Sequence, residues 1–121
     1  MAYLLVFIGG GLGSMLRFAI SKLNGIYLVP LPIGTLIANV LASLVLGLVI
    51  YYTLHGGSVQ HQQFRWLLAT GFCGGFSTFS TFSYETFLLI DQGLWAWAIC
   101  NVIASLLLCL VAVFAARFLM V

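Results

Sequence analysis

Apolar residues along this chain fall into long runs separated by short polar connections. The runs cover residues 2–22, 32–54, 64–90 and 94–119, and the connections between them cover 24–31, 55–63 and 91–93. A helix needs about 20 predominantly apolar residues to cross the hydrocarbon core of a bilayer. Each run is long enough, so the pattern predicts an all-α membrane protein with four transmembrane helices. All of residues 1–121 then form a single transmembrane domain.

The third run, residues 64–90, interrupts this apolar pattern in its middle. The stretch from Gly71 to Glu85 reads G-F-C-G-G-F-S-T-F-S-T-F-S-Y-E. Glycine has poor helix propensity, and the hydroxyl side chains that follow compete for backbone hydrogen bonds. We therefore expect a helix that is broken near residues 74–78. Carbonyl groups freed at membrane depth must line a cavity or coordinate an ion, and backbone oxygens favour a hard cation such as Na⁺.

Composition agrees with a lipid environment. Of the 121 residues, 64% are hydrophobic and only 5% are charged, whereas soluble domains carry about 25% charged residues. The net charge of +2, with no basic patch, gives no reason to expect nucleic acid as a partner. The runs contain no Ser–His–Asp set, no paired carboxylates and no ligands at metal-binding spacing, so we do not expect an enzyme.

Positive charges are divided evenly between the two sides of the predicted bundle. With four crossings, Arg65 and Arg117 lie on the side of the termini, and Lys22 and Arg17 lie on the other. The positive-inside rule then gives no preferred orientation. This balance fits either a weak topology signal or dual topology, in which copies insert both ways and pair antiparallel. Four short helices also leave no lumen of their own, so a polar path favours a homo-oligomer, most commonly a dimer.

The first run carries a motif for close helix packing. Gly9 and Gly13 form a G-x-x-x-G step, and small residues at this spacing let helix backbones approach closely in lipid. Arg17 follows near the end of the run. A cation in this position either extends to the lipid headgroups or meets an anion or a carbonyl inside the protein.

Two further runs carry an asparagine at membrane depth. Asn39 is followed by Ser43 on one helical face, and Asn101 is followed by Ser105 and Cys109 at the same spacing. An intramembrane asparagine often serves only as a hydrogen bond between helices. The alternative is that its amide N–H points into a polar path as an anion donor.

Aromatic and hydroxyl side chains alternate after the expected break. Phe76, Phe79 and Phe82 recur every three residues and are expected to share a face, beside a polar stripe of Thr78, Thr81 and Glu85. Such a phenylalanine stripe is usually core or lipid contact. Beside hydroxyl groups, however, ring edges carry partial positive charge and bind an anion weakly, as fast conduction requires.

Glu85 is the only glutamate of the chain. A carboxylate at membrane depth is costly, so by default it indicates function. The other reading is a carboxylate near the end of the run that reaches the membrane interface.

Three motifs together resemble the Fluc/CrcB family of small fluoride channels. They are G-G-G-L-G-S-M-L-R from Gly9 to Arg17, P-I-G-T-L-I-A-N from Pro32 to Asn39, and the stretch from Gly71 to Glu85. With the four-run layout, the resemblance covers essentially the whole chain.

The resemblance implies an antiparallel, dual-topology homodimer in a bacterial inner membrane, with two fluoride pores that let cytoplasmic fluoride leave passively. It implies a structural Na⁺ at the dimer centre, held by the backbone carbonyls of Gly74 and Ser77, and it matches Arg17 to the first-span arginine of the family. Most relatives have Thr-Thr-Phe where this chain has Ser77, Thr78 and Phe79; Na⁺ binding should survive if only the carbonyl is used. The pore residues that it implies are Asn39, Phe79, Phe82, Ser80, Thr81, Ser83 and Glu85.

Two rival functions stay open from the residues. A small proton-coupled multidrug exporter has a similar layout but carries its membrane-embedded acid in the first span, whereas here the candidate is Glu85 in the third. A non-transporting scaffold subunit is the second rival, and it leaves the hydroxyl stripes without a purpose.

Overall fold

Long helices account for most of the chain. The structure is a computed structural model that describes residues 1–24, 28–54 and 58–120. Its continuous helices α1 (Ala2–Ser21), α2 (Ile33–Thr53) and α6 (Trp95–Leu119) are each long and apolar enough to cross a membrane. The rest is α3 (Val59–Phe64), the π-helical segment η1 (Arg65–Cys73), α4 (Gly74–Phe76) and α5 (Phe79–Asp91). The described residues thus have the mostly helical, apolar architecture expected of a membrane protein.

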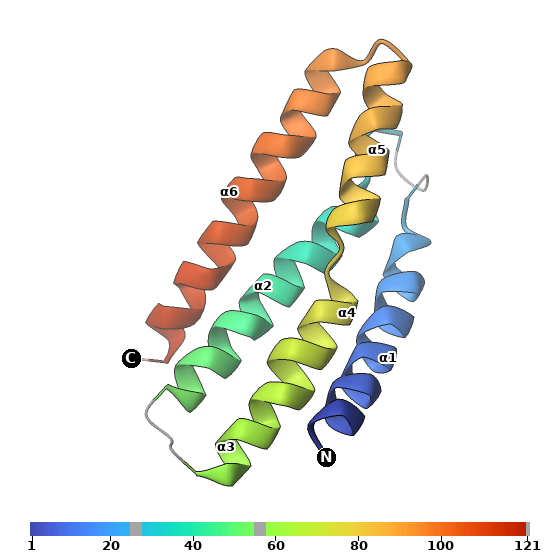
Figure 1. The fold of residues 1–121 in the computed structure, drawn as a ribbon. Coiled ribbons are helices and arrows are strands. Elements are labelled where there is room, and N and C mark those ends of the chain that lie inside the picture. Colours follow the sequence, from blue (N-terminus) through green and yellow to red (C-terminus); the bar gives the residue numbers. More distant parts are fainter. Residues whose placement is uncertain (25–27, 55–57, 121) are drawn as a thin grey trace.

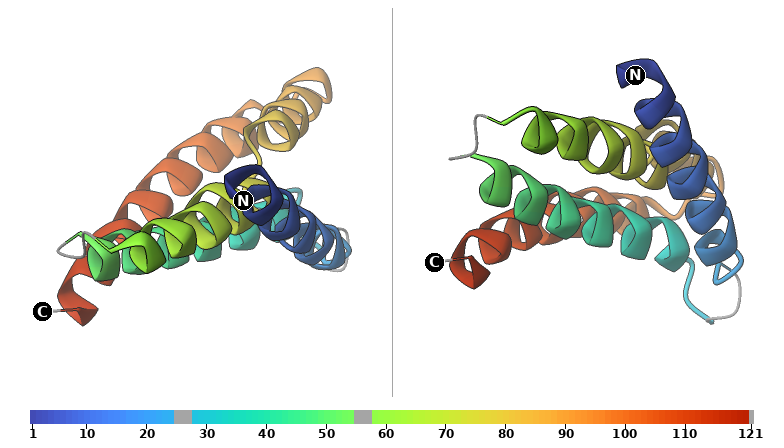
Figure 2. Two further views of the ribbon diagram at one scale, coloured as in Figure 1. Left: turned by 60° about the horizontal axis from the view of Figure 1, so that its bottom comes forward. Right: turned by 90° about the horizontal axis from the view of Figure 1, so that it is seen from below.

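Helix α2 lies at the centre of the arrangement (Figure 1). It packs along α6 on one side and against η1 on the other, while α1 packs against η1 and α4. Figure 2 shows this order from below, with α2 between α6 and the segment that runs from α3 to α4. In Figure 1 the N- and C-terminal ends lie at the end that holds α3, and the turn from α5 into α6 lies at the opposite end.

That turn is made by a glycine at the end of α5. Gly93 has a φ of 75°, a left-handed conformation that glycine adopts without steric cost. The N–H of Gly93 donates to Ile90 O at 2.9 Å, and the N–H of Leu94 donates to Leu89 O at 2.8 Å. This pair of bonds is a Schellman motif, which ends α5 and sends the chain directly back as α6.

The expected break in the third run is confirmed, and it falls at two residues. Helix α4 ends at Phe76 and α5 begins at Phe79, with Ser77 and Thr78 extended between them at ψ values of 157° and 119°. Gly74 and Gly75 stay helical. The hydroxyl of Thr78 accepts a hydrogen bond from the N–H of Thr81 at 3.2 Å and so caps the new helix.

The third run begins earlier than its apolar pattern predicts. Helix α3 starts at Val59, inside the connection expected over 55–63. Ser58 caps it by accepting from the N–H of His61. The capped helix includes polar residues that a hydropathy pattern assigns to the connection. His55 of that connection, and the glycines of both longer connections, lie outside the described residues.

Glycines bring α1 against the third run. Gly9 and Gly13 are buried; a Cβ at Gly9 would run into backbone atoms of η1, and one at Gly13 into backbone atoms of η1 and α4. From the other side, a Cβ on Gly71 would lie 3.0 Å from the Cα of Gly9, and one on Gly75 would lie 3.0 Å from the Cα of Gly10. Two G-x-x-x-G steps therefore face each other. The structure places Gly9 and Gly13 at a close approach of two backbones, as the packing prediction requires, and Gly71 and Gly75 are the partners that sequence reasoning missed.

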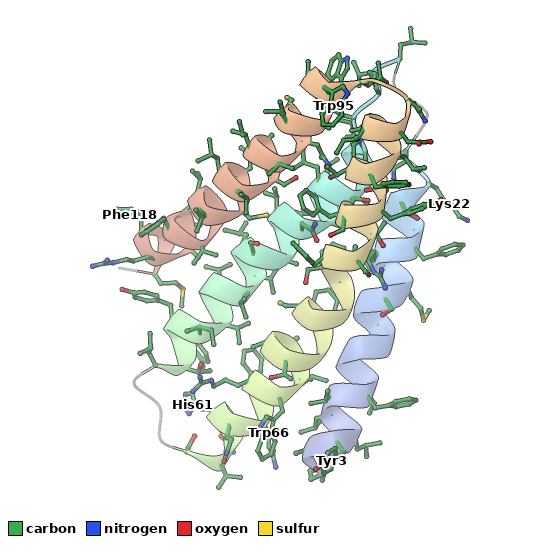
Figure 3. All side chains as sticks on the ribbon, turned by 45° about the horizontal axis from the view of Figure 1, so that its top comes forward. Tyr3, Lys22, His61, Trp66, Trp95 and Phe118 are labelled. Carbon is green, nitrogen blue, oxygen red and sulfur yellow. The ribbon has the colours of Figure 1, made fainter. Side chains whose placement is uncertain are left out.

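Amphipathic aromatic side chains mark the two ends of the bundle. Figure 3 shows Tyr3 and Trp66 toward the end that holds α3, and Trp95 near the opposite end. Tyr3 and Trp95 are exposed, and tyrosine and tryptophan concentrate where the hydrocarbon core meets the headgroups. With the apolar helices between them, these rings give the chain the surface of a multi-pass membrane protein.

Candidate functional site

A groove of about 370 Å³ opens where α5 begins, between α2 and α6, and we call it the central groove. It gathers side chains that are widely separated in the sequence. Its polar and thiol lining consists of Asn39, Ser43, Ser77, Thr78, Ser105 and Cys109, and its aromatic lining consists of Phe79 and Phe82. Three parts of the sequence therefore line one cavity. Helix α2 contributes Asn39, α6 contributes Ser105 and Cys109 from the face that holds Asn101, and α5 contributes the phenylalanines that follow the break.

The aromatic wall of the central groove is a pair of rings on α5. The centroids of Phe79 and Phe82 lie 5.6 Å apart with an interplanar angle of 40°, and Phe79 is 78% exposed. The expectation that Phe76 shares this face is wrong. Because the chain is extended at residues 77–78, Phe76 turns away, is 2% exposed and packs in the core with Ala38 and Ala42.

Asn39 holds the backbone of the break. Its Oδ1 accepts from the N–H of Thr78 at 2.8 Å, and its Nδ2 donates to the carbonyl of Thr78 at 3.3 Å. The side chain thus pairs both backbone groups of an extended residue that has no helical partner. An amide NH₂ carries two hydrogens, so one N–H remains for the central groove that Asn39 lines. The two roles considered from the sequence are therefore compatible.

Arg17 of α1 also contacts the backbone beside the break, just before the two extended residues. Its Nε donates to the carbonyl of Gly75 at 3.0 Å, and Ser14 donates to the same oxygen at 3.4 Å. Of the alternatives open for Arg17, the structure shows contact with a carbonyl inside the protein. The guanidinium group thereby stabilises a helix end that the break would otherwise leave without donors.

The carbonyls of Gly74 and Ser77 remain free among the described residues. The hydrogen bonds across the break engage the carbonyls of Cys73, Gly75 and Thr78, and no described donor reaches the other two. Gly74 is exposed, with open space where a Cβ would point. Free backbone carbonyl oxygens are the kind of ligand that suits Na⁺. Two oxygens are too few for a complete coordination shell.

Thr81 faces a second cavity of about 190 Å³, between α1, α2 and α5. It shares the lining with Arg17 and Thr35. The hydroxyl of Thr78 donates to the hydroxyl of Thr81 at 3.1 Å, which connects this cavity to the central groove through a chain of hydroxyl groups.

Glu85 lies farther along α5, in the lining of a third cavity of about 320 Å³. Its Oε1 accepts from Asn24 Nδ2 at 3.0 Å and from Thr35 Oγ1 at 2.8 Å. Its Oε2 is buried, with no hydrogen-bond partner among the described residues. The carboxylate is therefore held inside the protein. Sequence reasoning missed Asn24, for which the only signal was a polar residue just after the first run.

Ser80 and Ser83, the remaining pore candidates, are exposed on α5. The Ser80 hydroxyl lies 3.3 Å from that of Thr78, and the Ser83 hydroxyl donates to the carbonyl of Phe79 at 2.9 Å. One chain thus places Asn39, Phe79 and Phe82 together, and it places Thr81 and Glu85 in separate cavities.

Asn101 connects α6 to α5. It is buried, and its Nδ2 donates to Thr86 Oγ1 at 2.9 Å, while the Thr86 hydroxyl donates to the carbonyl of Phe82 at 2.8 Å. This geometry is that of a hydrogen bond between helices, and it steadies the turn that carries Phe82.

Comparisons with known proteins point to one family. A family model described as "CrcB-like protein, Camphor Resistance (CrcB)" matches residues 4–117. A protein of Pyrococcus abyssi named "Fluoride-specific ion channel FluC" is 47% identical over 111 residues, covering 92% of this chain and 89% of the relative. Proteins of the same name from Methanocaldococcus jannaschii (41% over 114 residues; 94% of this chain and 90% of the relative) and Coxiella burnetii (43% over 113 residues; 91% and 90%) are also similar.

Proposed function

The chain belongs to the CrcB family, and we propose that it is a passive ion channel selective for fluoride. The names of its relatives support the ion and the transport activity. The observation that carries the proposal is the central groove, where the rings of Phe79 and Phe82 meet hydroxyl groups and the amide of Asn39. Among the described lining residues there is no Lys, Arg or His, so an anion there would be bound by dipoles alone.

Such a lining suits fluoride for a physical reason. Fluoride is small and strongly hydrated, so a pore must replace its water with other donors before the ion can enter. Hydroxyl groups, an amide N–H and the positive edges of aromatic rings are such donors. None carries a full charge, so binding is weak enough at each step for the ion to move on. A narrow fit between rings disfavours the larger chloride ion.

The complete channel is proposed to be an antiparallel homodimer of four-span subunits with two pores. The central groove is open on one side, Phe79 is exposed, and the pore candidates of one chain are divided among separate cavities. A second copy would cover the groove and join these parts. The even division of Lys and Arg between the two sides suits subunits inserted in both directions.

The structural Na⁺ is proposed to lie between the two copies. Gly74 and Ser77 of each subunit would supply four carbonyl oxygens, and the ion would neutralise the helix ends that meet there. The Ser77 hydroxyl donates to Cys73 O at 2.8 Å. Serine in place of the usual threonine therefore leaves the Ser77 carbonyl free, which supports unchanged Na⁺ binding.

In the cell, the channel is proposed to lie in the inner membrane and to release accumulated cytoplasmic fluoride without catalysing a reaction. The multidrug exporter is the less favoured alternative. It requires Glu85 to exchange protons with a cationic substrate, whereas the Glu85 carboxylate accepts hydrogen bonds from two side chains. Glu85→Gln would abolish proton-coupled transport, and it would leave passive fluoride flux measurable.

Efflux from liposomes tests the proposal. Purified protein is reconstituted, and fluoride and chloride electrodes are read in parallel for the wild type, Phe82→Ile and Phe87→Ile. Phe87 is another phenylalanine of α5; it is exposed and does not line the central groove. We expect rapid fluoride loss without chloride loss, abolished by Phe82→Ile and kept by Phe87→Ile. Absence of fluoride flux from folded, reconstituted wild type would refute the channel.

A further inference from the structure

Asn24 bridges two parts of the chain that are far apart in the sequence. Its Oδ1 accepts from the backbone N–H of Gly34 at 2.6 Å, and its Nδ2 donates to Glu85 Oε1 at 3.0 Å. A backbone N–H only donates, and an ionised carboxylate oxygen only accepts. The two partners therefore fix which way the Asn24 amide faces, which cannot be read from the amide atoms themselves.

The Gly34 side of this bridge is rigid. The first N–H groups of a helix lack partners within it, and the residue that precedes α2 is Pro32, which provides no side-chain cap. Asn24 supplies the missing acceptor from the end of α1. A Cβ on Gly34 would lie 2.8 Å from Asn24 Oδ1 and 2.6 Å from the carbonyl of Ile20, so the approach depends on glycine. The Asn24 amide is thus anchored to the α1–α2 junction.

The Glu85 side of the bridge is asymmetric. Asn24 and Thr35 both donate to Oε1, at 3.0 and 2.8 Å, while Oε2 is buried with no partner among the described residues. Two donors on one oxygen hold the carboxylate in a single orientation and offset part of its charge. Asn24 and Glu85 both line the third cavity, of about 320 Å³. That cavity leaves room for other rotamers of Glu85 when a donor is lost.

We propose that Asn24 is a positioning residue that holds the carboxylate of Glu85 at the outer end of the ion path. The inference rests on the proposed channel function, in which Glu85 ends the polar track of α5. An anion that passes a carboxylate is repelled unless the negative charge is offset and kept to one side. Asn24 does both through one hydrogen bond. Without the bond from Asn24, the Glu85 carboxylate would keep only its hydrogen bond from Thr35. It would then adopt other orientations, some of which place its negative charge in the space that the ion must cross.

A reversal of the hydrogen bond tests this role. Asn24→Asp keeps an oxygen for the Gly34 N–H but sets a second carboxylate against Glu85. We expect fluoride efflux to fall about tenfold, the scale of losing one hydrogen bond to a charged group. In the double variant Asn24→Asp with Glu85→Gln, the new amide donates to the new carboxylate, and efflux should return to the level of Glu85→Gln alone. Gln92→Ala is the control, because Gln92 lines the same cavity without a described bond to Glu85.

A second readout does not depend on transport. The chain has one glutamate, so ¹³C-glutamate labelling gives a single side-chain carboxyl signal in NMR spectra of the detergent-solubilised protein. Asn24→Ala should shift or split that signal, and Gln92→Ala should leave it in place. An unchanged signal in Asn24→Ala overturns the inference even if efflux falls, because Asn24 then acts only as a cap for α2.

The outcomes separate the two proposals. Wild-type liposomes without fluoride flux refute the channel function, and the carboxyl signal still decides whether Asn24 holds Glu85. Wild-type flux with normal efflux from Asn24→Asp overturns the positioning role and leaves the channel intact.

Discussion

The two halves of the third run have opposite characters, although they lie end to end in one sequence segment (Figure 1). In the first half, η1 and α4, Gly71 and Gly75 lie against the backbone of α1. In the second half, α5, Phe79, Ser80 and Ser83 are exposed. The first half packs closely against α1 through its glycines. The second half presents side-chain chemistry on a surface that is not packed within the chain.

The difference follows from side-chain size. Glycine allows two backbones to touch, and van der Waals packing is what associates helices in lipid, but it offers no side-chain group to an ion. Hydroxyl and aromatic side chains offer polar groups to an ion, but bulky aromatic rings hold neighbouring backbones farther apart than glycine does. A continuous helix would carry one orientation through both halves, and the extended residues Ser77 and Thr78 remove that constraint.

The largest effect should come from filling the packing surface. A Cβ at Gly13 would lie 2.7 Å from the backbone N of Phe76, where a rigid backbone cannot give way. Gly13→Ala should therefore lower the free energy of unfolding by about 3 kcal/mol, at the upper end for overpacked cores. An SDS titration of detergent-solubilised protein measures this. Gly11→Ala, where a Cβ meets nothing within 4 Å, should be neutral or slightly stabilising. Equal losses in both variants would contradict the close packing.

The next effect should appear in flux rather than in stability. Phe79→Ala removes a ring that is 78% exposed, so the subunit itself should lose little packing energy. Fluoride efflux should fall about tenfold, because a ring edge contributes about 1 kcal/mol or more. Phe118→Ala, at an equally exposed ring of α6, should keep normal efflux. Normal efflux from Phe79→Ala would remove the ring pair from the ion path.

A smaller effect should come from removing the hydrogen bonds of Asn39 to the break between the two halves. Asn39→Ala removes the hydrogen-bond partner of the N–H and of the carbonyl of Thr78, at a cost of about 1 kcal/mol in the free energy of unfolding. Ser43→Ala, at a residue that lines the same groove, should change it by less than about 0.5 kcal/mol. Circular dichroism during SDS titration gives both values, and similar losses would mean that Asn39 does not support the break.

The smallest effect should come from the bond that joins α5 to α6. Thr86→Val preserves shape and removes the hydroxyl that accepts from Asn101. Hydrogen bonds between transmembrane helices contribute about 0.6 kcal/mol, so the SDS midpoint should move only slightly. Thr70→Val, at an exposed position of η1, should not move it. A loss above about 2 kcal/mol would show that Asn101 has a larger role than a single interhelical bond.

The sequence by itself determined the features that depend on hydropathy and conformational propensity over a few consecutive residues. Mean hydropathy and run length place the three continuous helices to within one residue at each end. The hydroxyl residues after the glycines place the break, because the Thr78 hydroxyl caps α5 through a backbone N–H only three residues away. The family followed from motifs that are contiguous in the sequence.

Tertiary structure alone decided which distant groups meet. Arg17 and Gly75 are 58 residues apart, and Asn24 and Glu85 are 61 residues apart, so no periodicity links them. Phe76 does not share a face with Phe79 because the extended residues Ser77 and Thr78 change the direction of the side chains that follow them. The three-residue spacing in the sequence does not reveal that change. Helix formation is a property of neighbours along the chain, whereas hydrogen-bond partners at membrane depth depend on how the helices pack.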